Sequence, residues 1–93
     1  MAYGRYGVGA YKNITASGNV SPIPTTVIGV LCATTSSGTV TLYDDAATGT
    51  GTPITGTITP AAGSFTPINA VTTKGLNVVV GGTINATVIY SPY

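Results

Sequence analysis

Several residue types that proteins use for chemistry are scarce or missing in this sequence. The 93 residues include no histidine, tryptophan, glutamate or glutamine, and one cysteine. Charged residues make up 5% of the chain, whereas a typical globular domain has about 25%. The charged side chains are those of Arg5, Lys12, Asp44, Asp45 and Lys74. Because most enzymes hold several titratable groups close together, this composition predicts a protein that is not an enzyme.

Asp44 and Asp45 are the only acidic residues in the sequence, so any catalytic or metal site that needs carboxylates would have to use them. Adjacent residues of a strand point to opposite faces, so the pair is poorly placed for acid–base catalysis. Calcium prefers about six to eight oxygen ligands, and the flanking residues lack the spaced acids of an EF-hand loop. We interpret the pair as a solvated turn, and we expect no catalytic, cofactor-binding or metal-binding residues.

Three further absences bear on which partners the protein binds and in which compartment it is made. A net charge of +1 gives no basic patch for nucleic acid, so we expect none to be bound. No stretch approaches the roughly 18 apolar residues of a membrane span, and the N-terminus lacks the apolar core of a secretory signal. The lone Cys32 ends the apolar run 27–32, which predicts a buried thiol in a protein made and assembled in a reducing cytoplasm.

The scarcity of charge has two interpretations. A surface of Thr, Ser, Asn and Gly repels its neighbours weakly, which suits a protein held at high local concentration in an assembly. The alternative is a threonine-rich soluble domain that needs no partner.

The residues that are abundant favour β-structure. Val, Ile and Thr account for 36 of the 93 residues, and they pack well on pleated sheets. Gly and Pro interrupt the chain every few residues, so no window predicts an amphipathic helix. Short strands separated by turns predict one all-β domain, a small antiparallel β-sandwich that is either jelly-roll or immunoglobulin-like. The seven predicted strands cover residues 12–20, 26–33, 39–43, 54–59, 64–71, 76–80 and 83–90.

Three local signals refine this prediction. Residues 34–38 (Thr-Thr-Ser-Ser-Gly) predict a turn, and Gly81-Gly82 predicts a tight hairpin turn. Pro67 predicts an edge position for the strand at residues 64–71, because proline has no N–H to donate to a neighbouring strand.

The first eleven residues differ from the rest and predict an extended arm, so we divide the chain into an arm (1–11) and a β-sandwich domain (12–93). Tyr3, Tyr6 and Tyr11 alternate with glycines, and Arg5 lies among them. Fully extended, this segment reaches about 35–40 Å. Tyrosine is enriched at protein interfaces, so these four residues are candidate partner contacts. A frayed terminus is the alternative.

A second, smaller anchor is predicted at the C-terminus. Tyr90 and Tyr93 are its candidate residues.

Four segments of the chain resemble small structural proteins of tailed bacteriophages in their order and spacing, across about residues 13–90. The segments are Ser37–Asp44, Thr48–Ile54, Lys74–Thr83 and Ala86–Tyr90. Small single-domain members with an N-terminal arm are most similar, and these are capsid decoration (cement) proteins. The resemblance implies a virion protein on the capsid surface that clamps neighbouring capsomers. Its implied partners are the major capsid protein and other copies of itself, in a homo-oligomer.

Two other functions remain open at this point. The chain is also compatible with a tail, adaptor or head-fibre component of the virion, which would be present in fewer copies. A carbohydrate- or receptor-binding adhesin module is the second. Such a module needs exposed aromatic residues on a concave face, for which Tyr43, Tyr90 and Tyr93 are candidates.

Overall fold

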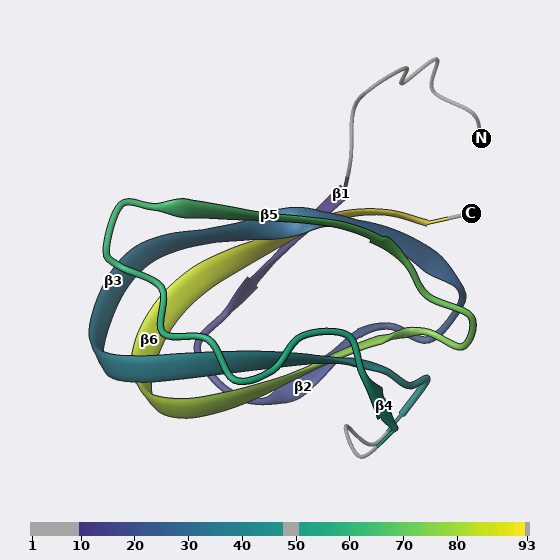
Figure 1. Cartoon of the computed structure of the whole chain (residues 1–93), viewed down its shortest axis with the longest axis horizontal. Helices are drawn as coiled ribbons and strands as arrows, with labels where there is room; N and C mark the ends of the chain where they lie inside the picture. The colour runs from purple at the N-terminus through teal and green to yellow at the C-terminus, as the bar shows by residue number, and fades with distance from the viewer. Residues whose placement is uncertain (1–9, 48–50, 93) are drawn as a thin grey trace.

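A computed structural model describes residues 10–47 and 51–92 and shows an all-β protein (Figure 1). Six antiparallel strands form one open sheet, which confirms the predicted fold class at this level. The described residues form no helix, and hence none that is long and apolar enough to cross a membrane. The strands are β1 (Ala10–Ile14), β2 (Gly18–Ser21), β3 (Thr25–Asp44), β4 (Thr52–Pro53), β5 (Phe65–Val71) and β6 (Leu76–Pro92).

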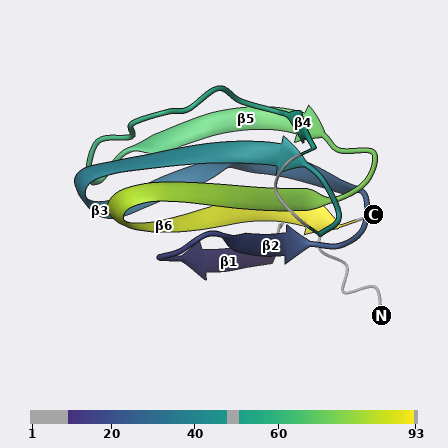
Figure 2. The same cartoon turned by 90° about the horizontal axis from the view of Figure 1, so that it is seen from below.

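Two long strands, β3 and β6, form the centre of the sheet. They pair along almost their whole length, from Thr25 opposite Pro92 to Asp44 opposite Leu76. Both bend near their middles, so that the sheet folds over on itself (Figures 1 and 2). The upper half-sheet of Figure 1 consists of β1, residues 83–92 of β6, residues 25–36 of β3, and β5. The lower half-sheet consists of β2, residues 76–81 of β6, residues 39–44 of β3, and β4.

The bend corrects two of the predicted turns. Residues 34–38 and Gly81-Gly82 do not end strands, because β3 and β6 continue through them and stay paired on both sides. The register shifts between Ser36 and Thr39, and both Ser37 and Gly82 have positive φ values, of 55° and 67°. Glycine and serine thus act here as a β-bulge that bends two paired strands together, not as a chain reversal.

Two predicted strands are also corrected. The run 12–20 is two strands, β1 and β2, which pair with different halves of β6. Between them, the Ser17 hydroxyl accepts a hydrogen bond of 2.8 Å from the Val80 amide. The run 54–59 is not a continuous strand and has a single β-bridge, between Val40 and Ile58. The predicted edge position of β5 is confirmed, since β5 pairs with β3 alone among the described strands.

The core lies between the two half-sheets. Side chains that alternate along β3 and β6 meet there, and residues from both half-sheets form one cluster. Cys32 is buried in it as a free thiol, as predicted. The fully or almost fully buried apolar residues are Ile14, Val20, Val27, Val30, Cys32, Val40, Leu42, Leu76, Val78, Ile84, Ala86 and Val88.

Asp44 fixes the loop that joins β5 to β6. Its carboxylate accepts hydrogen bonds from the Thr73 amide and hydroxyl, at 2.9 and 3.0 Å, and from the Lys74 and Gly75 amides, at 2.8 and 3.4 Å. Desolvation raises the pKa of Asp44, but the hydrogen bonds from Thr73, Lys74 and Gly75 outweigh it, so the pKa lies below its ordinary value of 3.8. The carboxylate therefore has a structural role in holding this loop.

Replacing Asp44 with asparagine is expected to lower the free energy of unfolding by about 1–2 kcal/mol at pH 7, because either orientation of the amide places an NH₂ group against backbone donors. The folded-state pKa is depressed, so this stabilisation is complete above the unfolded value and is lost as pH falls through the folded pKa. Urea titrations at pH 7 and pH 2 measure the effect. A difference between wild type and Asp44→Asn that is equal at both pH values would contradict this account.

Candidate functional site

The structure places only some of the residues that the sequence marks as partner contacts. Tyr3, Arg5, Tyr6 and Tyr93 lie outside the described residues. Tyr11 is part of β1 and is 75% exposed, so β1 includes the last two residues of the segment predicted as an arm. Tyr90 is half-buried in β6 and packs against the core. Of these predicted contacts, the structure describes Tyr11 and Tyr90, and Tyr11 presents most of its surface.

Tyr11 belongs to a row of residues that crosses all four strands of the upper half-sheet. Ile89 pairs with Tyr11 on one side and with Gly29 on the other, and Gly29 pairs with Pro67 of β5. Residues paired across antiparallel strands point to the same side of a sheet. Since Val88 and Tyr90 point into the core, Ile89 and its row lie on the outer side.

The next row on the same side is also partly apolar. Thr87 pairs with Asn13 and with Leu31, and Leu31 pairs with Phe65. Leu31 is 42% exposed and Phe65 is 45% exposed. At the end of β5, the exposed Val71 pairs with Thr26 on this side. We name the outer surface of the upper half-sheet the apolar face, and its residues are Tyr11, Leu31, Phe65, Pro67, Val71 and Ile89.

Phe65 lies flat on this face because Gly29 has no side chain. A methyl group on Gly29 would lie 2.4 Å from Cζ of Phe65 and 2.6 Å from the carbonyl oxygen of Thr66. The ring therefore occupies the space above the Gly29 backbone, and Gly29 itself is buried although it lies on the outer side. Any side chain at residue 29 would displace the ring from the sheet.

The outer surface of the lower half-sheet has a different composition. Its paired residues include Thr41 opposite Val79, and Asn77 between Asn19 and Tyr43. Val79 is a large aliphatic residue on this side. It is 37% exposed, which is close to the 42% of Leu31 on the apolar face. Polar side chains dominate here, so we name this surface the polar face.

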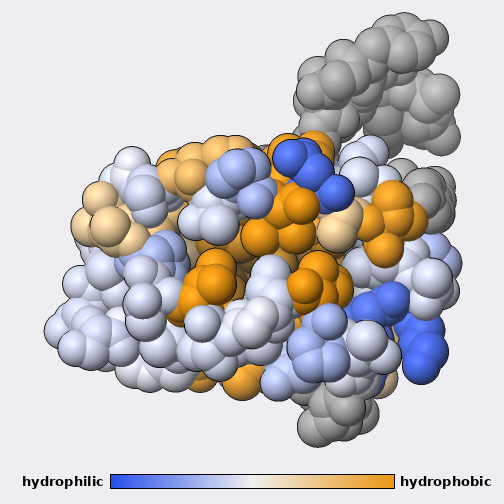
Figure 3. All heavy atoms as spheres, viewed as in Figure 1, coloured by the Kyte–Doolittle hydropathy of each residue, from blue (hydrophilic) through white to orange (hydrophobic). Residues whose placement is uncertain are grey.

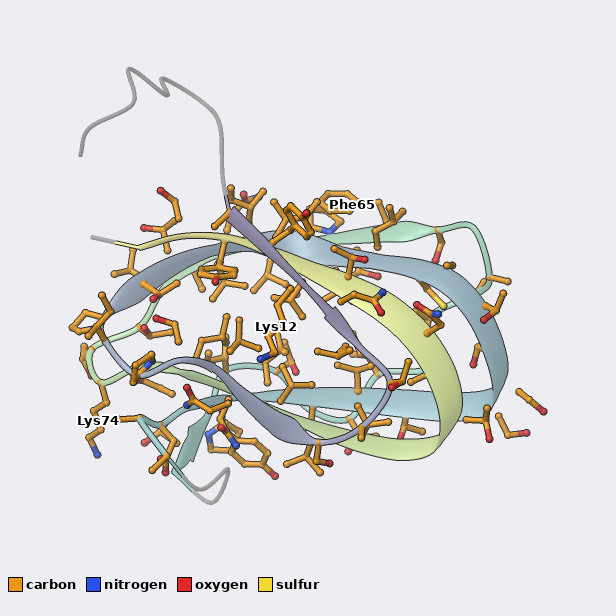
Figure 4. The ribbon with its side chains drawn as sticks, turned by 180° about the vertical axis from the view of Figure 1, so that it is seen from behind. Lys12, Phe65 and Lys74 are labelled. Atoms are coloured by element: carbon orange, nitrogen blue, oxygen red, sulfur yellow. The ribbon has the colours of Figure 1, made fainter. Side chains whose placement is uncertain are left out.

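The charged side chains of the described residues lie away from the apolar face. Lys12 pairs with Val88, a core residue, and so points to the inner side of the sheet at its edge. Figure 4 shows Lys12 at the opening between β1 and β2, Phe65 on the outer side, and Lys74 at the opposite end of the molecule. Asp44 ends the lower half of β3, and Asp45 follows it. The apolar face is thus neutral over its described area.

Both edges of the upper half-sheet carry features that oppose the addition of another strand. On β1, the inward-pointing Lys12 is a charge that an added strand would help to bury. On β5, Pro67 lacks an N–H, and Asn69, with φ of 53°, lies where the register with β3 shifts. Between β5 and the chain after β4, Figure 3 shows apolar atoms at the surface of the molecular edge. The features at β1 and β5 thus oppose extension of the sheet at either edge of the upper half-sheet.

The described residues do not place reactive groups together. Among them, no three His, Cys, Asp or Glu side chains lie close enough to hold a metal ion. The Asp44 carboxylate is occupied by the 73–75 loop. Tyr43 and Tyr90, which an adhesin would need on one concave face, lie on different half-sheets. The arrangement provides surfaces for packing.

Comparisons with known proteins leave the chain without an assigned family. No protein-family model, no curated protein and no solved structure matches it.

Sequence reasoning missed three central residues of the apolar face, namely Leu31, Phe65 and Ile89. The run 26–33 is apolar on both sides, a pattern that predicts a strand covered on both faces. That same signal, together with the single phenylalanine of the chain, indicates an apolar outer surface. Among the described residues no element covers the outer side of β3, so Leu31 on this side of the run stays 42% exposed.

Proposed function

We propose that this protein is a virion structural protein that binds the outside of a bacteriophage capsid and clamps neighbouring capsomers. The observation that carries the proposal is the contrast between the two outer surfaces of the bent sheet. One is neutral and apolar, with Tyr11 and Phe65 on its two flanking strands, and the other is polar. An exposed apolar surface on a small domain marks a site of contact with another protein.

The finer fold belongs to the same proposal. The two half-sheets act as the two layers of the expected β-sandwich, joined through the bend in β3 and β6. In this arrangement one layer is turned toward partners, and the other faces solvent. The resemblance to small structural proteins of tailed bacteriophages implies a β-sandwich, which is a two-layered unit of this kind.

The proposed clamp has two parts that follow one another along the chain. Residues 1–9 directly precede β1, and β1 carries Tyr11 on the apolar face. A protein that touches two capsid subunits makes their separation cost interface energy on both sides. Weak contacts of this kind become effective when they are repeated over a shell.

Removal of residues 1–9 is expected to weaken capsid binding by at least about tenfold and to leave the melting temperature of the free protein within a few degrees of wild type. The deletion ends before Ala10 because β1 pairs with β6 from that residue onward. The measurement is cosedimentation with expanded capsids that lack this protein, and circular dichroism reports the fold.

A substitution series separates the tyrosines from the length of the segment. Tyr3→Ser with Tyr6→Ser is expected to reproduce most of the loss, whereas Ala2→Ser is the matched control with unchanged binding. Equal binding by the full chain and by the truncated chain would refute the arm as a capsid contact. Failure of the full chain to bind capsids would refute the decoration function.

A further inference from the structure

We propose that the apolar face binds the apolar face of a second copy of this chain, so that pairs of copies pack upper half-sheet against upper half-sheet. The inference rests on the proposed function, because it assigns a partner to the surface that supports that function. Under this inference the clamp is a pair of copies: the apolar face joins the two copies to each other, and the N-terminal segment of each copy joins it to a capsid subunit.

The charge distribution favours a second copy as the partner. Two identical charged surfaces repel each other, whereas two identical neutral surfaces pack without burying an unpaired ion. Lys12, Lys74 and Asp44 all lie off the apolar face. The polar groups that remain on it, such as Asn13 and Thr87, can hydrogen-bond to each other or to trapped water. Two copies of the apolar face can therefore pack together without burying an unpaired charge.

The edges of the sheet favour face packing over strand addition. A second copy that extended the sheet at β1 would lie against Lys12, and one at β5 would meet Pro67 and the bulge at Asn69. Both features are ways in which natural sheets avoid pairing edge to edge. The surface between these edges has no such protection.

The size of the face indicates a weak pair. Four strands about 4.8 Å apart, each about seven residues long at about 3.3 Å per residue, project an area on the order of 450 Å². Stable complexes bury about 800 Å² per partner, so a contact of this size is weak in solution. On a capsid, where copies are held close to one another, a weak contact of this kind is populated through high effective concentration.

The strand order also predicts how the copies face each other. Sheets that pack face to face lie about 10 Å apart. With the two-fold axis parallel to the strands, β1 of one copy lies over β5 of the other. The row that contains Tyr11 then faces the same row of the other copy, so Tyr11 lies over the partner's Pro67, and Leu31 lies near the middle of the contact.

The test is a pair of variants that add the same charge to opposite faces. Leu31→Lys places a lysine in the middle of the apolar face, and Val79→Lys places one on the polar face at a similar exposure of 37% against 42%. Sedimentation velocity between about 10 µM and about 1 mM covers the range in which a small interface associates. We expect wild type and Val79→Lys to self-associate with the same constant, and Leu31→Lys to associate at least about 100-fold more weakly.

Two further measurements locate the contact. In NMR spectra recorded over the same range of concentration, amides of residues 28–31 and 87–89 are expected to shift, and those of 40–43 and 77–79 are not. Thr87→Lys, beside Leu31, is a second variant that tests the same surface if Leu31→Lys does not fold. Circular dichroism shows which variants keep the native sheet.

Capsid binding by each variant separates this inference from the proposed function. Self-association through the apolar face without capsid binding would support the inference and refute the decoration function. Capsid binding by a wild type that stays monomeric at about 1 mM, and is lost in Leu31→Lys, would overturn the inference and assign the face to the shell. Concentration-dependent shifts confined to the polar face would overturn it as well.

Discussion

Replacing Gly82 with alanine is expected to lower the free energy of unfolding by about 3 kcal/mol or more, which is a large part of the roughly 5–14 kcal/mol of a 93-residue domain. Gly82 has φ of +67°, which costs a residue with a side chain about 1–2 kcal/mol. In addition, the new methyl group would lie 2.3 Å from the carbonyl oxygen of Ser37 and 3.0 Å from its carbonyl carbon. These are backbone atoms of the paired strand, so relief requires the bend itself to open. Urea titration of the purified variant measures the loss.

Two other glycines separate the contributions. Gly63 has φ of +77°, and nothing lies within 4 Å of the place that an added methyl group would take, so Gly63→Ala is expected to cost only the dihedral strain of about 1–2 kcal/mol. Gly56 has neither a positive φ nor a close neighbour, so Gly56→Ala is expected to change stability by less than about 1 kcal/mol. If Gly82→Ala were no worse than Gly63→Ala, the close packing of β3 and β6 at the bend would not be needed for stability.

The bend explains which part of the fold the sequence predicts and which part it hides. Alternation along residues 39–43 and 83–90 correctly predicts strands with one side in the core. Glycine and serine at 36–38 and at 81–82 have the same local signature in a turn and in a bulge. The two are distinguished by pairing partners, because Ser36 opposes Thr83 and Thr39 opposes Gly81. That pairing is a long-range property, so no local pattern reveals it.

The candidate site is predictable in part. Tyrosine among glycines is typical of contact segments, which points to Tyr11, and Tyr11 is the most exposed of the large apolar residues within 10–47 and 51–92. The sequence does not mark Leu31 as a surface residue, because a run that is apolar on both sides is equally typical of a strand that other elements cover on both faces. Phe65, which pairs with Leu31, is not marked either. Local sequence shows how many sides of a strand are apolar, but not which of them the fold covers. In this fold the inner side of β3 is covered by the opposite half-sheet, and Leu31 on the outer side is 42% exposed.

Replacing Leu42 with alanine is expected to lower the free energy of unfolding by about 3 kcal/mol, since its side chain is fully buried between the half-sheets. The backbone of Leu42 donates to Thr55 and accepts from the Ile54 amide, at 3.1 and 2.7 Å, and these hydrogen bonds remain in the variant. The loss therefore reports packing in the core. In a domain of this size it corresponds to a fall in melting temperature of about 12 °C or more, which differential scanning calorimetry measures.

Leu31→Ala is the matched control for Leu42→Ala, because the same atoms are removed from the outer side of the sheet. Leu31 is 42% exposed, so its truncation is expected to cost less than about 1 kcal/mol in dilute protein. Self-association stabilises the folded state by mass action, so the melting temperature of wild type and of Leu42→Ala should rise with protein concentration. In Leu31→Ala this rise should be reduced or absent. A parallel rise in all three proteins would show that the core and the apolar face do not have the separate roles that their positions on opposite sides of the sheet predict.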